Sequence, residues 1–445
     1  MLVDKIIISI KVVKIKMKVL LIQPPSETQN LKVPPLGLAY LAAVLKKKKV
    51  IVKILDLNVE NTTLETYLTQ EKPDIVGVSA IVTNARNALN VTNKIKQVLP
   101  NSFIVMGGPY PSMMRTRLLV RHSEVDAVIF GEAEITFPKL VKQLQHQKKL
   151  DTIEGLVFRR DNKIMVNLQP KPILSLDQIP YPALDKLKMH LYGENAGVIF
   201  TSRGCPQQCM FCSRPIFGRT WRGNSPEYVL HEIERLVTKY NVSTLSVIDD
   251  NFTVDLDRVE KILDGIIAKK WKLKIYLWNG MRADHVTKNL LDKLKKAGCI
   301  AANYGVESVD PEVISFTRKG VSLEQIKRAI RLTHQVGIRV NIFLMIGNPK
   351  DNSKSADKLI DFIKKTHVDG VHLSMATPIF GTPFWDWVEK NGNWLDYDTE
   401  ELLDWPVDDV AGSYPVFETI DFTAKERIEA YLKVRNYLEE NALLV

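Results

Sequence analysis

The chain has 445 residues, of which 45% are hydrophobic and 25% charged, and its formal net charge at pH 7 is +10. This length suits roughly two to four domains, and the composition excludes a disordered or membrane-embedded chain. Four cysteines are too few for a disulfide framework, so we expect a reducing, cytoplasmic environment.

The N-terminal stretch, residues 5–16, is apolar, but lysines interrupt it and it is too short to span a bilayer. It therefore predicts neither a transmembrane segment nor a secretory signal. Met17 is an alternative start, because a strand pattern follows it directly. Positive charge is otherwise diffuse apart from residues 46–49, so we expect solvated lysine faces and no nucleic-acid partner.

Residues 1–140 are predicted to form the first domain. Apolar, β-branched runs predict strands at 18–23, 51–56, 75–80, 102–106 and 126–130, with helical patterns such as 84–99 between them. Five buried strands separated by helices predict an α/β fold with a parallel, doubly wound sheet, of the flavodoxin or Rossmann-like type. Such sheets bind ligands beyond the carboxyl ends of their strands, which makes the loops at 23–37, 79–85, 107–112 and 131–134 candidate binding loops.

Residues 141–195 contain a hairpin pattern around "RRDNKI" and a proline-rich connector, and we interpret them as a linker. Strand patterns resume at 197–201, 243–249, 273–278, 300–306, 338–346 and 371–376, again separated by helices. Six such units predict a partial (βα)6 barrel of the TIM type over residues 196–385, with its functional groups at the carboxyl ends of the strands.

Residues 386–445 are predicted to be a small, mostly helical extension rich in aromatic residues. Four of the seven tryptophans, at 385, 387, 394 and 405, fall within 21 positions around its start. These side chains are expected either to close the mouth of the barrel or to pack the C-terminal tail against it.

Three of the four cysteines, Cys205, Cys209 and Cys212, follow the first barrel strand. A zinc site needs four ligands, or three and an open position, and no second C-x-x-C pair exists. Cys299 has the setting of a buried residue at a strand start. Three thiolates on one loop suit an iron–sulfur cluster with one iron left open for substrate.

The loop resembles that of the radical S-adenosylmethionine (SAM) superfamily, whose pattern C-x-x-x-C-x-aromatic-C is matched by Cys205, Cys209, Phe211 and Cys212. The resemblance implies a 4Fe–4S cluster that binds SAM at its open iron and needs an external one-electron reductant. It also implies SAM contacts near the cluster and at the ends of the barrel strands, where "DD" stands in place of the usual Gly-Gly-Glu: Phe211, Asp249, Asp250, Arg282, Glu307, Arg318, Lys319, Ile346 and Gly347.

Residues 33–43, 76–85, 106–112 and 128–134 resemble, in that order, cobalamin-binding radical SAM enzymes of the class B methyltransferase type. Methylthiotransferases with a similar first domain carry three more cysteines, whereas residues 1–204 contain none. The resemblance implies that cobalamin is bound by Pro35, Leu36, Gly37, Tyr40, Ser79, Ile81, Val82, Thr83, Gly107, Gly108, Tyr110, Pro111, Gly131, Glu132 and Glu134.

Many cobalamin proteins bind cobalt from below through the histidine of a D-x-H-x-x-G motif. The first 121 residues of this chain contain no histidine, so we expect residues of "PSETQN" or "SAIVTN" at the lower face instead. An unligated lower face favours Co(I), which is a strong nucleophile.

The resemblance implies a C-methyltransferase that uses a 4Fe–4S cluster, SAM and cobalamin under anaerobic conditions. One SAM would methylate cobalamin, and a second would give the 5′-deoxyadenosyl radical that activates an unactivated carbon of the substrate. The alternative is an oxidative cyclase, or a lipid- or tetrapyrrole-modifying enzyme, that keeps both cofactors but transfers no methyl group. A cobalamin carrier with a degenerate barrel is a third interpretation, which the intact cysteine set opposes. The substrate is expected to be an apolar small molecule or a protein side chain.

Overall fold

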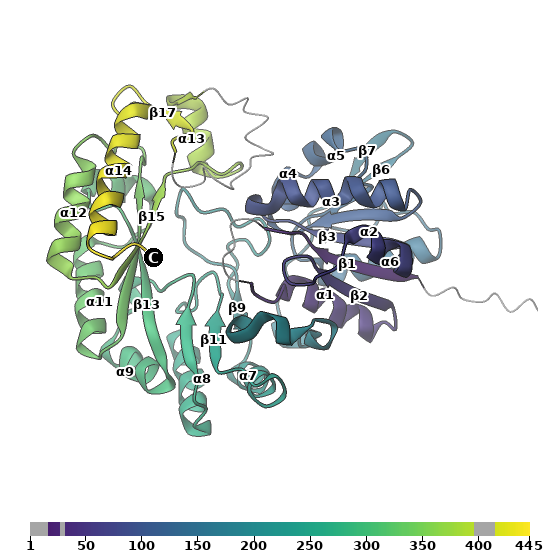
Figure 1. The fold of residues 1–445 in the computed structure, drawn as a ribbon, viewed down its shortest axis with the longest axis horizontal. Helices are drawn as coiled ribbons and strands as arrows, with labels where there is room; N and C mark the ends of the chain where they lie inside the picture. The colour runs from purple at the N-terminus through teal and green to yellow at the C-terminus, as the bar shows by residue number, and fades with distance from the viewer. Residues whose placement is uncertain (1–16, 27–31, 396–413) are drawn as a thin grey trace, which may run out of the picture.

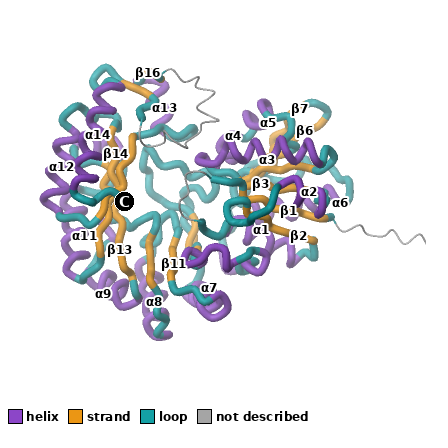
Figure 2. Tube along the Cα trace, viewed as in Figure 1, coloured by secondary structure: helices purple, strands orange, loops and turns teal. Residues whose placement is uncertain are grey.

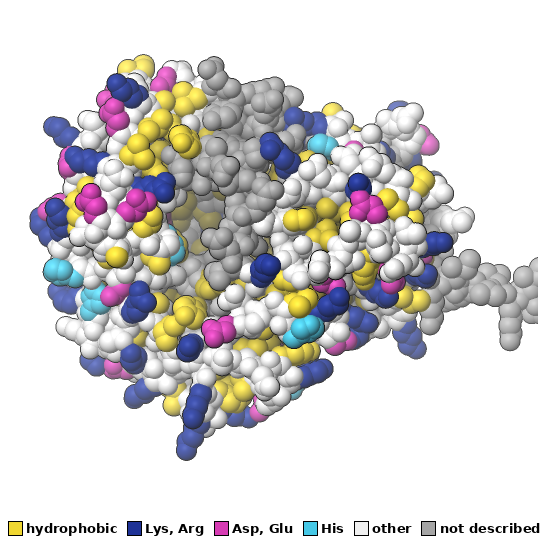
Figure 3. All heavy atoms as spheres, in the orientation of Figure 1, with side chains coloured by type: hydrophobic (Ala, Val, Ile, Leu, Met, Phe, Trp, Pro, Cys, Tyr) yellow, Lys and Arg dark blue, Asp and Glu magenta, His cyan; other side chains and the backbone are white. Residues whose placement is uncertain are grey.

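The computed structural model describes residues 17–26, 32–395 and 414–445. Two α/β units lie side by side, the first at the right and the second at the left of Figure 1. Within the described residues, we find no helix that combines the length and the apolar character needed to cross a membrane. On the face in Figure 3, lysine and arginine side chains are scattered rather than gathered into one patch.

The first unit is built on a seven-stranded sheet in the order β2-β1-β3-β4-β5-β6-β7. The first five strands pair in parallel, and β6 and β7 continue the sheet as an antiparallel hairpin. The strands are β1 (Lys18–Gln23), β2 (Ile51–Asp56), β3 (Ile75–Ser79), β4 (Phe103–Gly107), β5 (Ala127–Ile129), β6 (Leu156–Arg160) and β7 (Lys163–Val166). The helices are α1 (Leu36–Lys47), α2 (Leu64–Glu71), α3 (Ala85–Val98), α4 (Pro109–Met114), α5 (Thr116–Arg121) and α6 (Ala133–Gln145).

Alternate residues of β1 face opposite sides of this sheet. Val19 and Leu21 belong to one buried cluster, which includes residues of α1 and α6, whereas Leu20 and Ile22 belong to another, which includes residues of α2 and α3. Helices therefore cover both faces, and the predicted doubly wound fold is confirmed. The hairpin inside the predicted linker, 141–195, is part of this sheet, so we propose that the first domain extends to Val166 rather than to residue 140.

The second unit is a six-stranded parallel sheet in the order β15-β14-β13-β12-β11-β8, as predicted for the partial barrel. Helices line its outer side (Figure 2). The strands are β8 (Val198–Ile199), β11 (Thr244–Val247), β12 (Lys274–Leu277), β13 (Cys299–Glu307), β14 (Arg339–Ile346) and β15 (Gly370–Met375). The helices are α7 (Pro226–Tyr240), α8 (Leu256–Lys269), α9 (Lys288–Ala297), α10 (Pro311–Thr317), α11 (Leu323–Gln335) and α12 (Ser355–Thr366).

Helix α7 shows how local sequence sets these elements. The side chain of Ser225 accepts a hydrogen bond from the backbone N–H of Tyr228 and caps the helix, and Pro226 occupies its first turn. The C-terminal segment consists of α13 (Pro383–Asn391), the short strands β16 (Asn393–Trp394) and β17 (Phe417–Glu418), and α14 (Ala424–Glu440), which packs on α12 and β15.

The C-terminal aromatic residues pack largely on one another. The ring centroids of Trp385 and Trp394 are 4.6 Å apart, and those of Phe384 and Phe417 are 5.6 Å apart. Trp405 lies outside the described residues. Packing of the tail, the second of the two expected roles, therefore accounts for these four rings.

Candidate active site

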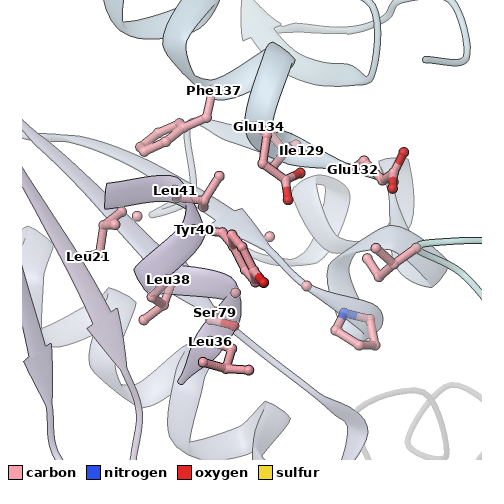
Figure 4. A pocket seen from close by; sticks show the side chains of 18 of the residues that line it. Leu21, Leu36, Leu38, Tyr40, Leu41, Ser79, Ile129, Glu132, Glu134 and Phe137 are labelled. Atoms are coloured by element: carbon pink, nitrogen blue, oxygen red, sulfur yellow. The ribbon is translucent and has the colours of Figure 1, made fainter. Parts of the chain in front are cut away.

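A cavity of about 340 Å³ lies at the carboxyl end of the first sheet, within the size range of small-molecule sites. Figure 4 shows Leu36, Leu38 and Tyr40 from α1 on one wall and Phe137 from α6 on another. Leu21, Gly77, Val105 and Ile129 from four parallel strands also line the cavity. The lining is mostly aliphatic, aromatic or glycine, and the lining residues that the structure describes include no histidine.

Ten of the fifteen predicted cobalamin contacts line this cavity: Leu36, Gly37, Tyr40, Ser79, Ile81, Gly107, Gly108, Gly131, Glu132 and Glu134. Five do not: Pro35, Val82, Thr83, Tyr110 and Pro111. Pro35 is the residue before α1, and Tyr110 is buried in the core of the first unit.

Gly108 shapes the edge of the cavity. Its φ is +101°, and a Cβ there would lie 2.7 Å from the carbonyl oxygen of Ala80. Only glycine fits this combination without strain, and it lets the chain turn sharply from β4 into α4.

Sequence reasoning missed the wall that the second unit contributes. Phe200, Arg203, Ile216, Phe217 and Ile248 complete the lining from the loops at the carboxyl ends of β8 and β11. The first-domain cavity therefore borders the loop that carries the three cysteines. Nothing in the local sequence around these residues indicates this, because it depends on how the two units sit against each other.

A buried group of charges, which we call the interdomain clamp, fixes this contact: Glu132, Glu134, Arg203 and Arg222. Arg203 and Arg222 face each other across the antiparallel pair β9 (Ser202–Arg203) and β10 (Arg222–Gly223). Both reach Glu132, at 3.0 and 2.8 Å, and Arg203 also reaches Glu134 at 2.6 Å. Burial alone would lower the pKa of Arg203, but the two carboxylates raise it above its ordinary value.

The clamp closes the base of residues 204–221, which we call the cluster loop because it holds Cys205, Cys209 and Cys212. Gly204 begins the loop with a φ of +82°, and a Cβ there would lie 2.4 Å from the carbonyl oxygen of Thr220. Arg214 donates to the carbonyl oxygen of Cys205 at 2.9 Å, and the N–H of Met210 donates to the carbonyl of Thr317 at 3.0 Å. These bonds hold the loop at its start and at its centre.

Cys205 is buried, and Cys209 and Cys212 are partly buried. Burial raises the pKa of Cys212 to about 11, and Arg214 partly offsets the increase. The structure does not bring the three sulfurs into ligating geometry: within the described ranges, no group of three or more His, Cys, Asp or Glu is arranged to hold a metal ion. The donor set nevertheless fits a cluster with one open iron, because the loop offers three thiols and no fourth.

One polar side chain borders the cysteines of the loop, and the fourth cysteine lies elsewhere. The side-chain amide of Asn251 lies 3.8 Å from the sulfur of Cys205, and sequence reasoning missed this contact. Cys299 is buried at the start of β13, and its thiol donates to the carbonyl of Ala301 at 3.4 Å, as its sequence setting indicated.

The two aspartates after β11 differ sharply in their surroundings. Asp249 is 2% exposed and accepts hydrogen bonds from the N–H of Thr201 and from the hydroxyls of Thr201 and Ser202. Burial raises the pKa of Asp249, against the effect of these bonds. Asp250 is exposed and accepts a bond from the N–H of Gly204 at 3.0 Å. Asp249 thus ties the strand ends together, whereas Asp250 faces outward.

Three further predicted SAM contacts form one network. Arg282 makes a two-pronged pair with Asp284, at 3.0 and 2.8 Å, and donates to the carbonyl of Lys319 at 2.9 Å. The ammonium of Lys319 in turn lies 2.7 Å from the carboxylate of Glu307. The structure therefore brings Arg282, Lys319 and Glu307 together, through bonds to the protein itself.

The remaining predicted contacts are spread along the edge of the barrel. Ile346 is fully buried at the end of β14, Arg318 is exposed at the end of α10, and Phe211 is partly buried in the cluster loop. The loop after Ile346 is held from both sides, because Gly347 donates to Asp351 at 3.1 Å and its carbonyl accepts a bond from the buried Arg427 of α14. Sequence reasoning missed Arg427, whose partner lies 80 positions away.

Two family models match the two units. One, described as the B12 binding domain, matches residues 27–141, and the other, the radical SAM superfamily, matches residues 199–363. The chain is 33% identical over 401 residues to an uncharacterized methyltransferase, PH0819, of Pyrococcus horikoshii. The matched region covers 86% of each chain. The chain belongs to the cobalamin-binding radical SAM family. Cobalamin, a 4Fe–4S cluster and SAM are accordingly its cofactors.

Other relatives of this cobalamin-binding radical SAM protein differ in the reactions that their names describe. It is 28% identical over 337 residues to an anaerobic magnesium-protoporphyrin IX monomethyl ester cyclase of Synechocystis, covering 72% of this chain and 67% of the cyclase. Its fold is similar to that of the radical SAM methyltransferase TsrM from Kitasatospora setae, with a TM-score of 0.74 and 18% identity over 86% of this chain and 81% of TsrM.

Proposed function

We propose that the chain is a cobalamin-dependent radical SAM C-methyltransferase, which moves a methyl group from SAM by way of cobalamin to an unactivated carbon of its substrate. One observation carries the proposal: the cavity at the end of the first sheet is completed by Phe200, Arg203 and Phe217 from the cluster-loop side. When bound, the cluster and SAM supply a carbon-centred radical, and cobalamin carries the methyl group.

The first unit would hold cobalamin through backbone and apolar contacts. Ser79, Gly107 and Gly131 present polar groups at the strand ends, while Leu36 and Tyr40 supply an apolar wall. Helices α1 and α6 both begin at this cavity without a side-chain cap, so their first N–H groups are available to the amide fringe or the phosphate of the ligand. The described residues of the lining include no histidine, which supports a lower face without an imidazole.

In the second unit, the three cysteines would hold the cluster, and Asn251 would donate a hydrogen bond to the sulfur of Cys205. Asp250 is the better candidate of the two aspartates for the SAM ammonium group, because Asp249 is already saturated by Thr201 and Ser202. Lys319, Arg282 and Glu307 would orient SAM as one network, since each already fixes another.

Anaerobic reconstitution with iron, sulfide, cobalamin, a one-electron reductant and trideuteromethyl SAM tests the proposal. We expect label on cobalamin together with release of 5′-deoxyadenosine, and then a labelled product when substrate-containing extract is added. Cobalamin that stays unlabelled while deoxyadenosine forms would contradict methyl transfer.

The likeness to the cyclase supports a second candidate, an oxidative reaction that uses both cofactors without methyl transfer. The product mass separates the two. Methyl transfer adds one CH2 group, whereas oxidative cyclisation removes hydrogen or adds oxygen.

A further inference from the structure

A second cavity, of about 490 Å³, lies beside the cluster loop. Three segments that are distant in sequence line it: α4 and its following turn, the cluster loop, and the loop after β15. The lining includes Met113, Arg115, Cys212, Arg214, Arg219 and Phe380.

This cavity adjoins both cofactor regions. Cys212, one of the three cluster cysteines, is in its wall. On the other side, the hydroxyl of Ser112 accepts a hydrogen bond from the N–H of Gly131, which lines the first cavity, at 3.1 Å. A molecule in the second cavity would therefore contact the cluster loop and lie one residue from the cobalamin cavity. Radical methyl transfer requires the substrate to lie in such a place, close to both cofactors.

The described charged side chains that line the cavity are all positive. Its described lining contains three arginines and no aspartate or glutamate. Arg115 donates to the carbonyl of Ser112 at 3.1 Å and to the side-chain oxygen of Gln169 at 3.2 Å, and Arg214 donates to backbone carbonyls of the cluster loop. These partners are neutral, so they satisfy hydrogen bonds without cancelling charge.

Arg219 is exposed at the rim, and no hydrogen bond or ion pair is found for it among the described residues. Guanidinium groups bind phosphate and carboxylate oxygens through paired, charge-assisted hydrogen bonds. Phe380 and Met113 also line the cavity and offer apolar surface.

We propose that this cavity binds the substrate, and that the substrate carries an anionic oxygen group, a phosphate, phosphonate or carboxylate, which Arg115 and Arg219 anchor while its apolar part lies against Phe380 and Met113. The inference rests on the proposed function, and it replaces the expectation of an apolar small molecule or a protein side chain as the substrate.

Phenyl phosphate, benzoate and benzyl alcohol serve as probes for the reconstituted holoenzyme, in equilibrium titrations with SAM present. The two anions are expected to bind and the neutral alcohol is not. With the cluster reduced, its unpaired electron should also shorten the phosphorus NMR relaxation time of bound phenyl phosphate, which places the probe near Cys212.

The Arg219→Gln variant is expected to raise the dissociation constant of phenyl phosphate about tenfold through loss of a charge-assisted contact. Arg331→Gln, at an exposed position of α11 outside the cavity, is the matched control and should leave it unchanged. Neither substitution should change SAM affinity. Equal binding of phenyl phosphate and benzyl alcohol, unchanged binding in Arg219→Gln, or a loss of SAM rather than phosphate affinity would each overturn the inference.

Failure of the inference and failure of the proposed function are separable. If the anions do not bind but label still appears on cobalamin, only the anionic substrate is wrong. If the anions bind at Arg219 but cobalamin is never labelled, the methyl transfer is wrong and the anion site stands.

Discussion

The residues predicted to bind cobalamin and those predicted to bind SAM differ in their surroundings. At the first sheet, predicted residues such as Gly37, Ser79 and Gly107 surround an open cavity. At the barrel edge, Asp249, Arg282 and Glu307 are bonded to other protein groups. A glycine at the end of a strand has no side chain, so it leaves room for a ligand beside the backbone. A charged side chain instead pairs with a nearby protein group wherever one is in reach. Charge at a strand end is therefore weaker support for a ligand contact than a tight, side-chain-free turn.

The largest expected effect is the loss of one cofactor but not the other. Cys205→Ser should abolish cluster binding and deoxyadenosine formation, because only two loop thiols remain. Cobalamin binding should persist, since none of the cysteines lines the first cavity. Iron analysis and the corrin absorbance measure the two losses. Cys299→Ser, at a buried thiol outside the loop, should keep its iron, and loss of cobalamin with Cys205→Ser would show that the regions are not independent.

The clamp between the regions should carry the next largest effect. Arg203→Met leaves Glu134 without its 2.6 Å partner and removes one of the two arginines at Glu132. Breaking such a buried pair costs about 3–5 kcal/mol of unfolding free energy, because a carboxylate is left uncompensated. Cobalamin affinity should fall as well, since Arg203 lines the cavity.

Denaturant titration of this variant is compared with that of Arg160→Met, which breaks an exposed 2.6 Å pair with Asp151. The control should lose no more than about 1 kcal/mol. Equal losses in the two variants would show that the clamp does not hold the units together.

Asp249 and Asp250 provide the next test. It asks whether hydrogen bonds to other protein groups distinguish a structural carboxylate from one that binds a ligand. Asp249→Asn should lower stability by about 1.5–3 kcal/mol, because the amide NH2 replaces one of the two oxygens that accept bonds from Thr201 and Ser202. Asp250→Asn should change stability by less than about 0.5 kcal/mol, as expected for an exposed position, but should weaken SAM binding. Thermal unfolding and SAM titration of both variants check this, and the reverse pattern would exchange the two roles.

The last effect depends on pH and concerns Glu232 of α7, a carboxyl group that is 2% exposed. Burial raises its pKa from 4.5 to about 8, which Arg235 only partly offsets. Because the folded pKa lies above the unfolded one, the native state holds the proton more tightly. Stability is then greatest below pH 4.5 and falls as pH rises toward 8, by about 1 kcal/mol per pH unit from this group.

Glu232→Gln should remove this part of the pH dependence, so the variant should be more stable than the wild type at pH 8 and close to it at pH 5. Unfolding midpoints across this range measure the difference. Parallel curves for the two proteins would mean that Glu232 does not titrate as its burial indicates.

The sequence predicted the strands well for a physical reason. A parallel strand covered on both faces, such as "KVLLIQ" of β1, is a continuous apolar run, and its bounds were predicted correctly as 18–23. The attachment of β6 to β5 was not predicted, because antiparallel pairing of a hairpin to a distant strand leaves no local pattern.

The same limit applied to the site. The cluster loop could be predicted because its three thiols are local in sequence. The bond from Arg203 to Glu132 spans 71 positions and depends on the placement of two units, so neither the clamp nor the barrel-side wall of the cavity was foreseen. The pairing of Arg282 with Asp284, two positions further along the chain, was not predicted either.

The central claim is that cobalamin and the cluster share one reaction space. Electron paramagnetic resonance of the reconstituted enzyme, with cobalt as Co(II) and the cluster either oxidised or reduced, tests it most directly. We predict that reducing the cluster broadens or splits the Co(II) signal through spin coupling, and that Cys205→Ser abolishes the change. A Co(II) spectrum identical in both cluster states would contradict the account.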